Sequence, residues 1–184
     1  MPPKPENCCA VVLTYPYHAL SVELSLFLLN STPRPTVRTR FFLDASARHH
    51  APLARNKSIA DALAQEEISI THFLLFDWDS RPVIEPKESS KKDIRPWLEA
   101  DGDIVGAVYP TGNEHAWDGT TVHMGCLRVA RAVFEKLPQP WFAFEYSADG
   151  KEVLKCECTS FTERAKIAGF SIVQAGYCGH WRGV

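Results

Sequence analysis

The chain has 184 residues, of which 45% are hydrophobic and 23% are charged, and its formal net charge at pH 7 is -2. This composition indicates a globular protein with one well-packed domain, and the small net charge argues against a general nucleic-acid or membrane-surface binder. No segment reaches the roughly 18 consecutive apolar residues needed to cross a bilayer, and no signal peptide is evident. We therefore expect a cytoplasmic protein with no membrane span, whose cysteines are thiols.

The first half of the chain alternates apolar runs with helical patterns. After a flexible, proline-rich start at 1–7, strands are predicted over 8–14, 37–44 and 71–76, and helices over 18–30 and 52–66. This alternation predicts an α/β fold in which a single domain, 8–184, has a mostly parallel central sheet with helices on both faces. Ligands of such sheets bind at the carboxyl ends of the strands.

The second half of the chain is less regular. Helices are predicted over 89–98, 130–137 and 160–167, and strands over 103–109, 122–129 and 170–175. The last helix is predicted to begin at Ser160, because Ser160 and Glu163 have the spacing of a capping box, and to stop at Gly169.

Two aspartates directly follow the third predicted strand. Asp77 and Asp79 would place carboxylates at the rim of the sheet, where hard oxygen ligands suit Mg²⁺ or Mn²⁺. The remaining coordination positions of such an ion can be filled by phosphates, so we interpret the pair as a metal-diphosphate site. A strand followed by an acidic turn with Ser80 and Pro82 is the plainer alternative.

Four other residues could bind a different metal. Cys156 and Cys158, together with Cys178 and His180, could supply four zinc ligands, although their spacings are unlike those of common zinc knuckles. A zinc-stabilised interaction module is therefore a less favoured alternative.

A series of short motifs runs along residues 8–182. They are Thr14-Tyr15-Pro16, Ala54-Arg55-Asn56, Phe76-Asp77-Trp78-Asp79, the run from Asp103 to Pro110, the run from Val133 to Pro138, Arg164-Ala165 with Ala168-Gly169-Phe170, and Gly179-His180. Their order and spacing resemble a glycosyltransferase of the GT-A fold, and most of all the small phage-type and bacterial relatives of family two. The resemblance implies one Rossmann-like domain that binds a nucleoside-diphosphate sugar, with a UDP-sugar as the expected donor.

The resemblance also implies roles for individual residues. Asp77 would reach the ribose and, with Asp79 and His180, would hold Mn²⁺ or Mg²⁺ at the diphosphate. The other nucleotide-binding residues would be Thr14, Tyr15, Pro16, Arg55 and Asn56. For His180 the plainer alternative is a surface histidine, and for Arg55 it is a solvated arginine.

The catalytic base is the point at which this chain departs from the family. A base must take the proton of the acceptor hydroxyl, and the aspartate that does so in the family falls on Cys158. A thiol is a poor replacement because it is mostly neutral near pH 7. Glu157, one residue earlier, is therefore our candidate for the base.

The expected activity is transfer of a sugar to a hydroxyl group of a glycan or a protein, with inversion. A catalytically degenerate protein that binds nucleotide sugars or acts as a scaffold is the main alternative. Many relatives use a C-terminal extension to hold acceptors or to dimerise. Because this chain ends at Val184, we expect a partner chain or a second copy to supply that part.

Overall fold

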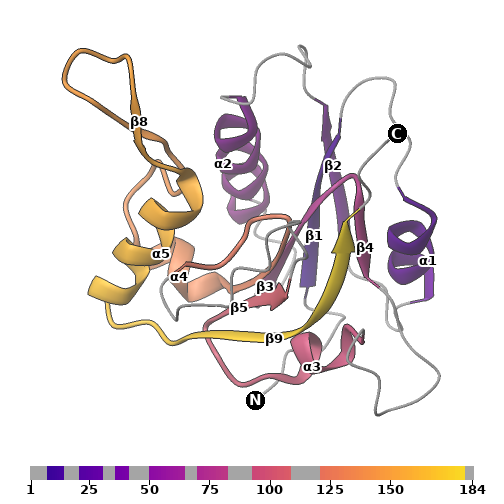
Figure 1. Cartoon of the computed structure of the whole chain (residues 1–184). Coiled ribbons are helices and arrows are strands. Elements are labelled where there is room, and N and C mark those ends of the chain that lie inside the picture. The colour runs from indigo at the N-terminus through magenta and orange to yellow at the C-terminus, as the bar shows by residue number, and fades with distance from the viewer. Residues whose placement is uncertain are drawn as a thin grey trace.

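The computed structural model describes residues 8–14, 21–30, 36–41, 50–64, 70–82, 93–108 and 121–180. These residues form an α/β fold around a seven-stranded sheet (Figure 1). Its strands are β1 (Cys8–Thr14), β2 (Thr36–Phe41), β3 (His72–Asp77), β4 (Ser80–Pro82), β5 (Ile104–Val108), β6 (Cys126–Ala130) and β9 (Ile172–His180). The helices are α1 (Val22–Asn30), α2 (His50–Leu63), α3 (Arg95–Glu99), α4 (Arg131–Lys136) and α5 (Glu157–Ile167). A separate hairpin pairs β7 (Glu145–Tyr146) with β8 (Val153–Lys155).

The strand order is β2-β1-β3-β6-β5-β9-β4. Strand β1 is parallel to β2 and β3, and β5 is parallel to β9. Strand β6 is antiparallel to both β3 and β5, and β4 is antiparallel to β9. The sheet is therefore mixed, and the prediction of a mostly parallel sheet was wrong. An apolar run indicates that a strand is buried, but it carries no information about the direction in which the strand runs.

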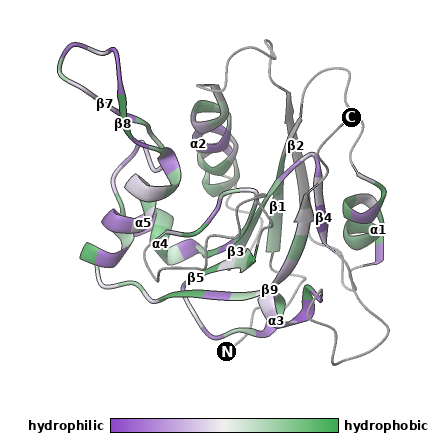
Figure 2. Ribbon diagram, in the orientation of Figure 1, coloured by the Kyte–Doolittle hydropathy of each residue, from purple (hydrophilic) through white to green (hydrophobic). Residues whose placement is uncertain are grey.

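Hydrophobic cores lie on both faces of the sheet, as predicted. Alternate residues of β1 point to opposite sides, so Cys9 and Val11 join a core with α2, α4 and α5, whereas Ala10 and Val12 join a second core with α1 and α3. We call these the first and second cores. In Figure 2 the ribbons of β1 and β3 are largely green, the colour of hydrophobic residues. Within the described part of the chain, no helix is long and apolar enough to cross a membrane.

Several element boundaries differ from those predicted. The strand expected over 122–129 begins only at Cys126, and the last strand continues to His180. The hairpin of β7 and β8 was not predicted, because its strands are short and largely exposed. Residues 18–20 and 42–44, at the ends of a predicted helix and strand, lie outside the described residues.

The predicted start of α5 at Ser160 was also wrong. The helix begins at Glu157, and its N-cap is Cys156, whose sulfur accepts a hydrogen bond from the Thr159 backbone N–H. Ser160 is therefore a buried residue inside the helix. Gly169, with a φ of 87°, follows the helix end, as the sequence predicted.

A glycine fixes the contact between β9 and α3. The register of β5 and β9 shifts between Gly106 and Val108, and Gly176 of β9 has a φ of 67°. A Cβ added at Gly176 would lie 2.7 Å from the backbone nitrogen of Trp97. The side chain of Trp97 is large and fully buried in the second core. Only glycine both adopts this conformation easily and allows the approach.

We predict that Gly176→Ala lowers the free energy of unfolding by about 2–4 kcal/mol, through the strained φ and the clash with Trp97. Gly150→Ala is the matched control, because Gly150 has a φ of 71° but nothing within 4 Å of its added Cβ. The control should lose only about 1 kcal/mol, from backbone strain. Urea unfolding of both variants measures this, and equal losses would contradict the proposed contact.

Candidate functional site

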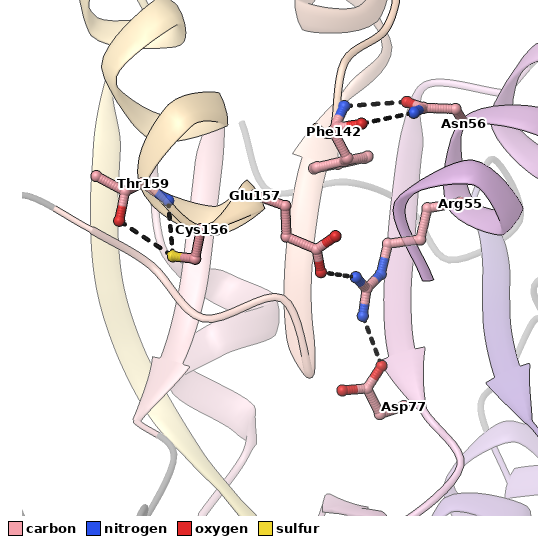
Figure 3. A network of polar contacts seen from close by, with 7 residues as sticks. All are labelled: Arg55, Asn56, Asp77, Phe142, Cys156, Glu157 and Thr159. Atoms are coloured by element: carbon pink, nitrogen blue, oxygen red, sulfur yellow. Dashed lines mark hydrogen bonds and ion pairs between the residues drawn. The ribbon is translucent and has the colours of Figure 1, made fainter. Parts of the chain in front are cut away.

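The carboxyl end of β3 and the start of α5 meet at one arginine of α2 (Figure 3). Arg55 is only 3% exposed. Its Nη2 donates to Oδ1 of Asp77 at 2.7 Å, and its Nη1 donates to Oε1 of Glu157. One buried guanidinium thus joins two carboxylates that come from distant parts of the chain.

The surroundings of Arg55 and Glu157 shift the pKa values of both side chains. Burial lowers the pKa of Arg55, but the charges of Asp77 and Glu157 outweigh it, so that this pKa lies above its ordinary value. Burial raises the pKa of Glu157 above its ordinary value, against the opposing charge of Arg55. The Asp77 side chain is 35% exposed, so this carboxylate is at the solvent side of the group.

One buried atom of the group has no hydrogen-bond partner among the described residues. Oε2 of Glu157 is buried and makes no hydrogen bond to any described residue. An unpaired buried carboxylate oxygen is costly unless a ligand or solvent satisfies it. Oε2 is therefore a buried acceptor of this group whose hydrogen bond is not supplied by the described residues.

Asn56, the neighbour of Arg55, fixes the position of α2. Its Nδ2 donates to the carbonyl oxygen of Phe142 at 2.7 Å, and its Oδ1 accepts from the Phe142 N–H at 3.0 Å. Both ends of the amide are therefore used to attach α2 to the segment that follows α4. A contact between Asn56 and a nucleotide stays a prediction.

The turn that carries Asp79 is held from two sides. Ser21 donates from its N–H to the Trp78 carbonyl and from its hydroxyl to the Ser80 carbonyl. The Gly125 carbonyl accepts from the Asp77 N–H and from the Ser80 hydroxyl. The sequence analysis missed Ser21 and Gly125. The one available signal was that Ser21 precedes an apolar helix, where its hydroxyl accepts from the Leu24 N–H.

Backbone pairing brings the predicted nucleotide and metal residues to the same edge of the sheet. Leu13 lies opposite Asp77 in the parallel pair of β1 and β3, so β1 ends at Thr14 beside the aspartates. Ser80, next to the buried Asp79, lies opposite His180. The side chains of Thr14 and His180, and the whole of Tyr15 and Pro16, lie outside the described residues.

The donor types at this edge suit a hard cation, but they do not yet form a complete site. Among the side chains that the structure describes, no three His, Cys, Asp or Glu groups are placed to hold a metal ion. In the predicted site, Asp77 and Asp79 would supply oxygen ligands and His180 would supply an imidazole as the third donor. The metal assignment to these three residues stays a prediction.

The zinc site considered from the sequence does not form. Cys158 packs against the first core, whereas Cys178 is buried in the second core, on the opposite face of the sheet. The sheet separates the two sulfurs, so Cys156, Cys158, Cys178 and His180 cannot share one ion. The spacing of cysteines in the sequence could not reveal on which face each sulfur lies.

Comparison with known proteins supports the fold only. No family model and no curated protein matches the chain. A solved structure entitled "Crystal Structure of A197 from STIV" is similar with a TM-score of 0.57 and 14% sequence identity, over 95% of this chain and 86% of that chain. At this identity the similarity concerns the arrangement of helices and strands, not function.

We predict that Arg55→Met lowers the free energy of unfolding at pH 7 by about 3–5 kcal/mol, because Glu157 is left buried without its cation. Its folded-state pKa, already raised in the parent, then rises further. A carboxyl whose pKa is higher in the folded state than in the unfolded state loses its contribution to stability as the pH rises through its folded-state pKa. The loss of unfolding free energy in Arg55→Met should therefore grow as the pH rises above 4.5, the ordinary pKa of a glutamate.

Two controls accompany this measurement, made by urea unfolding at several pH values. Arg131→Met breaks an exposed pair with Glu135 and should cost less than about 1 kcal/mol. Adding Glu157→Gln to Arg55→Met should remove the dependence on pH. A deficit independent of pH in Arg55→Met would contradict the assigned role of Glu157.

Proposed function

We propose that this protein is a metal-dependent glycosyltransferase of the GT-A type, with a Rossmann-like arrangement at its nucleotide-binding edge. It would move a sugar from a nucleoside-diphosphate sugar to an acceptor hydroxyl. The observation that carries the proposal is the meeting of Asp77 and Glu157 on the buried Arg55, at the edge where β1 and β3 end. A partly exposed carboxylate, Asp77, and a buried one, Glu157, thus lie near the strand ends where α/β folds bind nucleotides.

The donor would lie against the ends of β1 and β3. Asp77 and Asp79, with His180, would hold Mn²⁺ or Mg²⁺, which when bound neutralises charge on the departing diphosphate. The turn from Asp77 to Ser80 is fixed by backbone hydrogen bonds, so its carboxylates need little reorganisation to bind a ligand. Thr14, Tyr15 and Pro16 would contact the nucleoside.

Glu157 would act as the base for the acceptor. Its Oε1 is engaged by Arg55, and its unpaired Oε2 would accept the proton of the acceptor hydroxyl. The raised pKa of Glu157 brings it closer to neutral pH, which favours reversible proton transfer. Arg55 would hold the carboxylate in place while the proton is taken.

A catalytically degenerate nucleotide-sugar binder is the second candidate. The observation that favours it is the ion pair itself, because the positive charge of Arg55 stabilises the ionised form of Glu157 and so makes it a weaker base. Binding and turnover must therefore be measured separately.

The metal assignment can be tested by thermal shift with nucleoside diphosphates, with and without manganese. We predict that Asp79→Asn removes the manganese-dependent part of the shift while nucleotide binding without metal persists. Asp149→Asn is the control, since Asp149 lies on the exposed hairpin. An undiminished manganese-dependent shift in Asp79→Asn would eliminate Asp79 as a ligand.

The catalytic assignment can be tested with Glu157→Gln, followed by release of nucleoside diphosphate from a panel of donors. The amide keeps the shape of the side chain, so we predict unchanged donor binding and transfer lowered roughly 10²–10⁴-fold. Glu152→Gln, at an exposed position of the hairpin, should transfer like the parent. Equal turnover in Glu157→Gln and the parent would remove Glu157 as the base, and donor binding without turnover in the parent would favour the degenerate binder.

A further inference from the structure

Two cysteines flank Glu157 at the start of α5. Cys156, the N-cap, is exposed, and its sulfur lies 3.5 Å from the Thr159 nitrogen and 3.2 Å from Thr159 Oγ1 (Figure 3). Cys158 lies within the first turn, is half-buried and packs against the first core. Because Glu157 between them is helical, their α-carbons are about 5.4 Å apart, a separation that a disulfide can span.

The two sulfurs differ in protonation. A hydrogen bond from the Cys158 thiol, aided by those from Thr159, lowers the pKa of Cys156 to about 4. The same contact raises the pKa of Cys158 above its ordinary value. The pair therefore combines an exposed thiolate with a neighbouring thiol that keeps its proton. An accessible thiolate next to a second cysteine is the arrangement found in redox-sensitive sites.

The remaining cysteines of the chain lack these properties. Cys8, Cys9, Cys126 and Cys178 are all buried. Burial raises the pKa of Cys8 to about 11 and also raises that of Cys126. Oxidation should therefore be selective for the start of α5.

We propose that Cys156 and Cys158 form a peroxide-oxidisable dithiol that controls the position of Glu157. The Cys156 thiolate attacks one oxygen of a hydroperoxide, the O–O bond breaks, and the leaving oxygen takes a proton and departs as water or an alcohol. The Cys158 sulfur then attacks the sulfenic acid at Cys156, and its proton leaves with the hydroxyl group as water. Two thiols are oxidised to one disulfide, the peroxide is reduced, and an external dithiol reverses the reaction.

The disulfide would change the site described above. Cys156 would no longer be an anionic acceptor for the Thr159 N–H, so the first turn of α5 would lose its cap. Glu157 lies between the bridged residues, and its contact with Arg55 depends on the course of that turn. The effect of oxidation on sugar transfer rests on the proposed function, whereas the thiol chemistry does not.

The test begins with the reduced 184-residue chain, which is treated with one equivalent of hydrogen peroxide, blocked with iodoacetamide and digested with trypsin. Cleavage after Lys155 and Arg164 releases 156–164, which contains only these two cysteines. We expect this peptide to be lighter by two hydrogen atoms, unalkylated, and restored by dithiothreitol. Cys158→Ser should stop at a sulfenic acid that dimedone traps, and Cys156→Ser should oxidise far more slowly.

A second measurement tests the reactivity of Cys156 directly. Its alkylation rate in the parent should change less than about twofold between pH 6 and pH 8, whereas that of an ordinary thiol rises by about two orders of magnitude. A steep rise, a peptide that stays reduced, or equal oxidation of Cys156→Ser and the parent would overturn the dithiol.

Hydrogen exchange tests, without an activity assay, whether oxidation changes the turn that positions Glu157. We expect the amides of the first turn of α5 to exchange faster after oxidation and to recover with dithiothreitol, and unchanged exchange would overturn this part of the proposal. If the reduced chain binds no donor, the proposed function fails while the thiol result still stands. If it binds and turns over donors equally in both redox states, control of the site is refuted.

Discussion

The burial of Arg55 is the constraint on which the rest of the site depends. Removing a guanidinium from water costs several kcal/mol, and the cost is offset only when its partners are present with good geometry. Asp77 at the end of β3 and Glu157 at the start of α5 are those partners. The ion pairs therefore fix α2, β3 and α5 relative to one another, and the Asn56 contact with Phe142 adds a second attachment beside them.

The two carboxylates that pair with Arg55 lie in different environments. Asp77 is partly exposed, at the edge where solutes can reach it, whereas Glu157 is buried and its pKa is raised. Two acids in contrasting environments can serve different roles. Sharing one arginine is compatible with this division, because each carboxylate uses only one oxygen for Arg55.

Local patterns predicted the elements well, and long-range contacts account for the failures. The apolar run before Asp77 correctly predicted β3, because its four central side chains are all buried. The role of Arg55 could not be read from the sequence, because its partners Asp77 and Glu157 are 22 and 102 residues away. The start of α5 was misplaced because a cysteine N-cap is not among the residues that usually mark a helix start.

The packing around the start of α5 explains why a cysteine is suited to position 158. Successive residues on a helix are rotated by about 100°, so neighbours at the start of α5 face different surroundings. Glu157 faces Arg55, whereas Cys158 packs against the first core. An aspartate at 158 would place a carboxylate among the apolar groups of the first core. At the start of α5, Glu157 therefore supplies the carboxylate that pairs with Arg55, and the adjacent Cys158 packs against the first core.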